Sequence, residues 1–241
     1  MKSSHLVIRH TITAGFGVAF ALLASCANSG SNSSGGRGAF LEKTWATPEF
    51  QKTDVQKKYS SVYIAPVQTS KLAKQDWWSS QNSRTQSEVL AKDAKRLGKQ
   101  LETSLAREIR AYPGNRLSIA SRPGPNTLTI ETAITELVPS KAYWNAGASA
   151  AGFVVPGAGL LSMAGAGKVS IGGRLSDSSG TQATFSDTRS DDISPVNLRS
   201  YEWYGGAERN IETWAKQGAA FLHAAPGSDI KRTSNITLNP F

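Results

Sequence analysis

Thr127 to Glu136 reads TLTIETAITE, and this regular alternation predicts a half-buried β-strand. One face of the strand carries Leu128, Ile130, Thr132 and Ile134, and the other carries Thr129, Glu131, Ala133 and Thr135. A strand with one apolar face must bury that face against another layer. We therefore expect an α+β fold, with an antiparallel sheet and two helices packed on one face of it.

Ser83 to Tyr112 supplies the clearest of these helices. Its apolar residues recur at steps of three and four and form one stripe: Leu90, Ala94, Leu97, Leu101, Leu105 and Ile109. Pro113-Gly114 ends the segment, as is usual after a helix. We predict that three of these leucines are buried against the sheet and the second helix. The predicted contacts join Leu97, Leu101 and Leu105 to Ile64, Ile130, Ile171 and Trp214.

The remaining elements follow from shorter patterns. Strands are predicted at Ser61–Val67, Arg116–Ala120, Lys168–Leu175 and Gln182–Arg189, the last two forming a hairpin around Asp177–Gly180. A second helix is predicted at Ala207–Ala224, because its apolar residues share one face and Pro226-Gly227 follows it. Phe40–Lys58 is expected to be irregular, since Pro48 interrupts any helix there.

The N-terminal segment indicates export. Lys2 and Arg9 begin it, and an apolar stretch too short for a membrane-spanning helix follows them. The stretch ends in Leu23-Ala24-Ser25-Cys26, which contains the only cysteine of the chain. This junction resembles the lipobox of bacterial lipoproteins, where the cysteine thiol is lipidated and becomes the first residue after cleavage. The alternative is an ordinary secretory peptide with a cysteine near the cut by chance.

The resemblance to a lipobox implies a domain layout and a location. Residues 1–25 are the signal peptide, 26–39 the lipidated cysteine and a flexible polar linker, 40–225 the α+β domain, and 226–241 a polar tail. The lipoprotein anchor carries two or three acyl chains, such as palmitate, which gives stable membrane attachment. By the Gram-negative sorting pattern, Ala27 in place of Asp implies the outer membrane, with the domain facing the periplasm.

The charge of the chain is basic. Its net charge is +9, and loss of Lys2 and Arg9 with the signal peptide leaves +7. A basic envelope protein can bind anionic headgroups, lipopolysaccharide phosphates or glycan, or the charge can simply keep it soluble. The Lys and Arg residues are scattered without a nucleic-acid signature, so we expect no nucleic-acid partner.

Residues 142–167 are unusual. They contain no charged side chain, and 14 of the 26 are Gly or Ala. Three interpretations stay open: a loop packed within the domain, a contact with a second copy or a partner, and a hairpin that dips into the membrane. The residues that would supply apolar contact are Phe153, Val154, Val155, Leu160, Leu161 and Met163.

Residue types typical of catalysis are sparse after the signal peptide. His223 is the only histidine there, and we expect it at the surface at the end of a helix. Asp191-Asp192 could hold calcium or act as acid and base, although a solvated loop explains the pair better. Trp77-Trp78 could form a binding platform or cap the core. We assign no catalytic residue, no metal site and no cofactor.

The order of several short segments resembles a known family. These segments are 58–67 (KYSSVYIAPV), 123–128 (PGPNTL), 133–139 (AITELVP), 177–180 (DSSG), 187–189 (DTR), Trp203, 206–208 (GAE) and 214–215 (WA). Together they resemble domain-of-unknown-function family 3313 of small bacterial lipoproteins, over about residues 40 to 225. The resemblance implies an exported α+β lipoprotein domain and no known activity.

These observations lead to three function hypotheses. The first is a non-enzymatic binding or assembly factor of the cell envelope, anchored in the membrane through Cys26. The second is a self-associating envelope protein that uses residues 142–167 for oligomer or membrane contact. The third is an enzyme, for which the sequence offers the least support.

Overall fold

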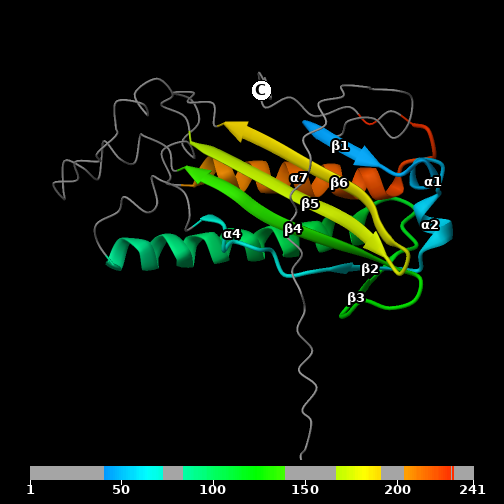
Figure 1. The fold of residues 1–241 in the computed structure, drawn as a ribbon, viewed down its shortest axis with the longest axis horizontal. Helices are drawn as coiled ribbons and strands as arrows, with labels where there is room; N and C mark the ends of the chain where they lie inside the picture. The colour runs from blue at the N-terminus through cyan, green and yellow to red at the C-terminus, as the bar shows by residue number, and fades with distance from the viewer. Residues whose placement is uncertain (1–40, 73–83, 139–166, 191–203, 229, 231–241) are drawn as a thin grey trace, which may run out of the picture. The chain divides into compact units, whose positions relative to one another are not determined.

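The computed structural model describes residues 41–72, 84–138, 167–190, 204–228 and 230. Within them, four helices accompany one mixed sheet of six strands (Figure 1). The elements in chain order are β1 (Lys43–Ala46), α1 (Pro48–Gln51), α2 (Val55–Lys58), β2 (Ser61–Ile64), α4 (Arg84–Ala111), β3 (Ser118–Ala120), β4 (Thr127–Val138), β5 (Lys168–Asp177), β6 (Gly180–Ser190) and α7 (Gly205–His223).

The sheet has the strand order β1-β6-β5-β4-β2-β3. The pairs β1–β6, β6–β5 and β5–β4 are antiparallel, as expected. The expectation of an antiparallel sheet is wrong for the other half, because β2 runs parallel to both β3 and β4. The reason is α4, which follows β2 and carries the chain back before the next strand begins. A helical crossover of this kind places the flanking strands parallel.

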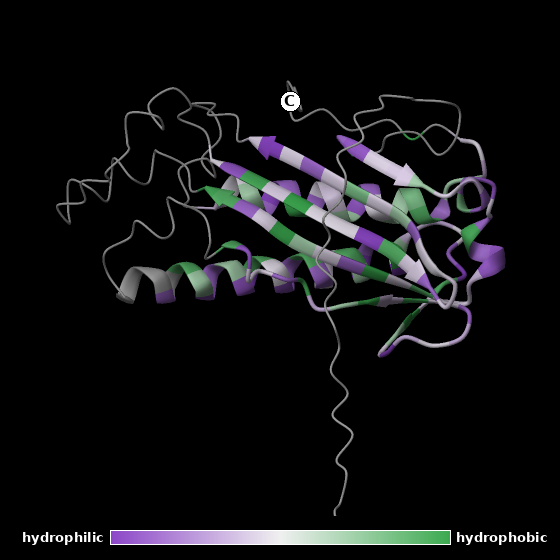
Figure 2. Ribbon diagram, viewed as in Figure 1, coloured by the Kyte–Doolittle hydropathy of each residue, from purple (hydrophilic) through white to green (hydrophobic). Residues whose placement is uncertain are grey.

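The alternation of buried and exposed residues predicted along β4 is present in the structure. Leu128, Ile130, Thr132 and Ile134 are buried, and the residues between them are partly exposed. Bands of opposite hydropathy alternate along the same strand in Figure 2. The register pairs Ile130 with Leu175 and Ile134 with Ile171, so that β5 adds its apolar residues to the same face.

Two long helices, α4 and α7, cover this apolar face, and Figure 1 shows α7 behind β5 and β6. Leu101 and Leu105 of α4 and Trp214 of α7 line one cavity together with Ile130 and Ile171 of the sheet. The predicted core contacts among these residues are confirmed. The other two predicted core residues also belong to this core: Leu97 is fully buried and Ile64 is partly buried.

A polar clamp joins the two long helices. Ser104 Oγ donates to Glu212 Oε1 at 2.7 Å, and Gln100 and Arg107 donate to the same carboxylate. Burial alone would raise the pKa of Glu212, but the hydrogen bonds from Ser104 and Arg107 outweigh it and lower the pKa. Glu212 therefore stays charged and fixes α7 beside α4.

The prediction of an irregular segment at Phe40–Lys58 is wrong, because it contains β1, α1 and α2. Pro48 does not interrupt a helix here; it occupies the first turn of α1, where its missing N–H costs nothing. Thr47 caps that helix, and its Oγ1 accepts from Phe50 N at 3.2 Å. Phe50 and Val55 are fully buried, so this segment closes one end of the core.

Candidate functional site

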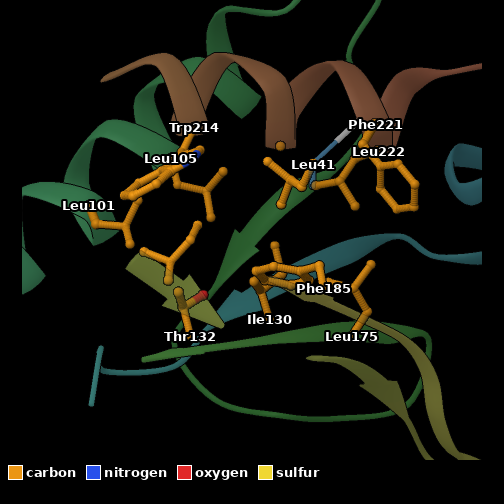
Figure 3. Close-up of a pocket in the computed structure, with 12 residues that line it drawn as sticks. Leu41, Leu101, Leu105, Ile130, Thr132, Leu175, Phe185, Trp214, Phe221 and Leu222 are labelled. Atoms are coloured by element: carbon orange, nitrogen blue, oxygen red, sulfur yellow. The ribbon is translucent and has the colours of Figure 1, made fainter. Parts of the chain in front are cut away.

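A cavity of about 40 Å³ lies between the two long helices and the sheet. Figure 3 shows side chains from α4, α7 and three strands converging on it. Thr132 contributes the one hydroxyl among side chains that are otherwise apolar, and Gly218 leaves space on the α7 side. A space of this size and character can accommodate a small apolar group and offers no acid, base or nucleophile.

A buried ion pair lies next to Trp214, one of the residues that line this cavity. Asp187 and Arg189 point to the same face of β6, and each side chain is at most 1% exposed. Arg189 Nε donates to Asp187 Oδ2 at 2.8 Å, and Trp214 Nε1 donates to the same oxygen at 2.7 Å. Arg189 Nη2 donates to Gln217 Oε1 at 2.7 Å. The pair therefore ties β6 to two successive turns of α7.

The second oxygen of Asp187 connects the start of the domain to the same network. The Glu42 backbone N–H donates to Asp187 Oδ1 at 2.9 Å. Buried charges are tolerated when hydrogen bonds satisfy their polar atoms, as they do here. Sealed from water, this network positions β6, α7 and residue 42, and it is not available for acid–base chemistry.

The chemical interpretation of the sequence missed this ion pair. From the sequence, Asp187 and Arg189 are noted only as part of a short family segment, and Trp214 is assigned to the core without a polar partner. A signal was present in the alternation of β6, because Asp187 and Arg189 continue the face that carries Ala183. Charged residues at inward positions of a strand indicate a buried pair.

A second carboxylate is held at the β5–β6 turn. Asp177 accepts hydrogen bonds from the Tyr59 hydroxyl at 2.8 Å and from the Ser179 backbone N–H at 2.8 Å, and it pairs with Lys58 at 3.1 Å. Burial alone would raise the pKa of Asp177, but the bonds from Ser179, Tyr59 and Lys58 hold it well below its usual range. Gly180 completes the turn with φ at +117°. The cluster joins the hairpin to the end of α2.

His223 differs from the sequence expectation. It is half-buried, and its ring stacks on Tyr112 with 4.2 Å between centroids. Its Nδ1 lies 2.7 Å from the Ala219 carbonyl, and its Nε2 lies 2.9 Å from Asn115 Oδ1. Burial lowers the pKa of His223, and the hydrogen bond to Ala219 offsets this only in part. The residue joins the end of α7 to the loop that follows α4.

This environment predicts a pH dependence. Because the pKa of His223 in the folded state is below the ordinary 6.5, its contribution to stability is present above pH 6.5. The contribution is lost as the pH falls through the folded-state pKa. An NMR titration of its ring protons should give a midpoint below 6.5 in a chain that lacks the predicted signal peptide with His5 and His10. Replacing His223→Gln should flatten the pH dependence of stability in this range, and a midpoint at or above 6.5 contradicts the assignment.

Most of the residues singled out in the sequence lie outside the described residues. This holds for the lipidation candidate, for all six apolar residues of the 142–167 segment, and for the tryptophan and aspartate pairs. They are Cys26, Phe153, Val154, Val155, Leu160, Leu161, Met163, Trp77-Trp78 and Asp191-Asp192. Their roles remain predictions.

Two further observations apply to the described residues alone. No group of three His, Cys, Asp or Glu side chains lies close enough there to hold a metal ion. Among the helices of residues 41–72, 84–138, 167–190 and 204–228, none is both long and apolar enough to cross a membrane.

The chain is similar in sequence to one family of proteins. The model of the family described as "Protein of unknown function (DUF3313)" matches residues 42–218. This range begins just before β1 and ends within α7, so it takes in the buried ion pair and most of the cavity lining. Leu41, Phe221 and Leu222 of that lining lie outside it. No curated protein matches the chain.

Three solved structures are distantly similar. The PelC dodecamer from Paraburkholderia phytofirmans is 12% identical, with a TM-score of 0.40 over 76% of this chain and 96% of that chain. Protein XCC0632 from Xanthomonas campestris, of family DUF330, is 11% identical, with a TM-score of 0.35 over 74% and 90%. A candidate lipoprotein from Caulobacter crescentus is 13% identical, with a TM-score of 0.27 over 70% and 89%.

Proposed function

Since the chain belongs to DUF3313, a family of proteins of unknown function, we propose a role from its own features: a lipid-anchored protein of the bacterial cell envelope that acts by binding or assembly. The observation that carries this proposal is the junction Leu23-Ala24-Ser25-Cys26 ahead of the domain. The polar residues 27–38 follow it, and the ordered domain has begun by Leu41.

The chemistry of the described residues supports binding over catalysis. Asp187 and Arg189 are sealed in the core and saturated with hydrogen bonds. Asp177 is held by the residues around its turn, and Glu212 clamps two helices. The cavity is lined by apolar side chains. These three carboxylates of the described part thus have structural tasks. On the basis of Ala27, we place the protein in the outer membrane, facing the periplasm.

Replacing Cys26→Ser tests the anchor. Without the thiol no lipid can be attached, so the variant should remain an unprocessed precursor or leave the membrane fraction. Mass spectrometry of the wild-type N-terminus should show acyl mass on Cys26. Ser29→Ala, in the adjoining linker, is the matched control and should remain in the membrane fraction. An unmodified Cys26 thiol in the processed protein refutes the proposal.

One structural observation favours self-association through residues 142–167 as a second candidate. Val138 pairs with Lys168, so β4 and β5 remain hydrogen-bonded partners up to the two ends of this connection. Two to five residues suffice to join antiparallel strands, and connections longer than about 12–15 residues are uncommon and are usually either functional or linker segments. Residues 139–167 are far longer than the hairpin requires.

A loop replacement tests this second function. Residues 146–166 are exchanged for a short Gly/Ser linker, which leaves the paired ends of β4 and β5 unchanged. We expect the stability of the fold to change little and the oligomeric size or liposome binding to fall. The double variant Leu160→Ser/Leu161→Ser should reproduce the effect without shortening the chain. Unchanged size and liposome binding in both variants show that the segment is an idle loop.

A further inference from the structure

The outward side of α4 carries a row of cationic side chains. Residues spaced three, four and eleven positions apart lie on one side of a helix. The row comprises Lys92, Lys95, Lys99 and Arg110, flanked by Arg96 and Arg107, and all six are exposed. From Lys92 to Arg110 it extends about 27 Å along the helix axis.

Half of these charges are compensated within the domain. Lys99 pairs with Glu102 at 2.8 Å, and Arg96 and Arg107 pair with the α7 residues Glu208 and Glu212. Among the described residues, the other three cations of the row form no ion pair. They are Lys92, Lys95 and Arg110.

Most charges on the opposite surface of the domain are paired. On the outer face of the sheet Arg174 pairs with Glu131, and Lys168 pairs with Glu136 at 3.0 Å. The two large faces of the domain therefore differ. Among the described residues, Lys43 stays unpaired on the outer face of the sheet, whereas α4 presents three unpaired cations in one row.

We propose that this row on α4 docks the domain on an anionic lipid surface. The inference rests on the proposed anchor at Cys26, since residues 27–40 have a root-mean-square reach of about 20 Å. That tether keeps the domain within contact distance of the bilayer. It joins the domain on the helical side of the sheet, where Leu41 contacts the cavity beside Phe221 and Leu222. Charge complementarity then selects acidic headgroups as the surface that α4 meets.

The strength of such docking follows from the charges that remain unpaired. Each Lys or Arg near an acidic membrane strengthens binding by about fivefold, and the attraction falls off within a Debye length of about 10 Å. Loss of three cations should therefore weaken docking by about 100-fold. The tether supplies attachment, and the row fixes which face of the domain lies against the lipid.

The test uses the lipidated full-length chain in vesicles and introduced cysteines as labelling sites. Cys26 is acylated and no other cysteine exists, so one new cysteine gives a unique free thiol. Thr103→Cys reports from the outward side of α4, and Thr184→Cys reports from the outer face of the sheet. Each carries a fluorophore, and its accessibility to an aqueous quencher is measured on phosphatidylcholine vesicles with and without about one third phosphatidylglycerol.

We expect the α4 label to be protected only on the acidic vesicles, and the protection to disappear in about 1 M salt. The triple variant Lys92→Gln/Lys95→Gln/Arg110→Gln should lose the protection of the α4 label on acidic vesicles. A matched variant with three exposed cations removed elsewhere should keep it: Lys43→Gln/Lys52→Gln/Arg122→Gln. Equal accessibility on both vesicle types, or protection of the sheet label in place of the α4 label, overturns the proposal. Protection that rises with protein density on neutral vesicles identifies a second copy as the occupant and overturns it too.

Flotation of the same samples separates this inference from the anchor. Wild-type protein that floats with neutral vesicles has a working anchor whatever the label reports. If it floats only with acidic vesicles, the anchor proposal fails. In that case, salt-sensitive protection of the α4 label on the acidic vesicles still supports docking through the cationic row.

Discussion

Replacing Asp187→Ala should lower the free energy of unfolding by about 3–5 kcal/mol, the usual cost of breaking a buried ion pair. The Arg189 guanidinium would remain in the core without its carboxylate. The Trp214 indole N–H and the Glu42 backbone N–H would lose their acceptor as well. Urea unfolding followed by tryptophan fluorescence measures the loss.

A double variant distinguishes the cost of an unpaired buried charge from the cost of lost side-chain packing. Asp187→Leu/Arg189→Met removes both charges and should recover much of the stability lost in Asp187→Ala, because no uncompensated charge remains. Asp177→Ala provides a comparison at a carboxylate near the surface of the domain and should cost less. A loss below about 1 kcal/mol in Asp187→Ala would mean that water reaches the pair, contrary to its burial.

Leu101→Ala should cost about 2–5 kcal/mol, and we expect the upper part of that range. Leu101 is 4% exposed and already borders the cavity beneath α4 and α7, so its removal enlarges an existing void. The thermal midpoint should fall by many degrees. Lys99→Ala, two residues earlier on the outward side, loses only an exposed ion pair and should barely change it. Equal effects of the two variants contradict the assignment of the buried face.

The elements with regular apolar patterns could be predicted from the sequence. The helix expected at Ser83–Tyr112 is observed at Arg84–Ala111, and the strand expected at Thr127–Glu136 extends to Val138. In both elements one face is buried, so the apolar residues recur with the period of that helix or strand. The buried face can therefore be predicted from the local sequence. The family membership, recognised from short ordered segments, is also confirmed.

The errors have physical reasons. Strand direction depends on where α4 returns the chain, and an alternating pattern is the same in parallel and antiparallel strands. β1 has only four residues and three of them are at least partly exposed, so it has little apolar pattern to detect. The sequence prediction treats Pro48 as a helix breaker, whereas a proline in the first turn of a helix favours the helix.

The candidate site was the least predictable part. The cavity depends on how side chains from five elements fill one volume, which no local pattern records. The α4–α7 clamp depends on Ser104 and Glu212, which are far apart in the sequence and unremarkable in their own segments. Only Asp187 and Arg189 carried a local signal, as charges at inward positions of a strand.

The hydrogen bond between Glu42 and Asp187 has a mechanical consequence for a tethered domain. A pull on the linker at residues 27–40 reaches the fold at Leu41. The hydrogen bond from the Glu42 backbone N–H to Asp187 Oδ1 is therefore the first described hydrogen bond to bear the force. Asp187 passes that force to Trp214 and Arg189 in the core. The four residue pairs between β1 and β6 thus share the tension from the membrane with this buried hydrogen-bond network.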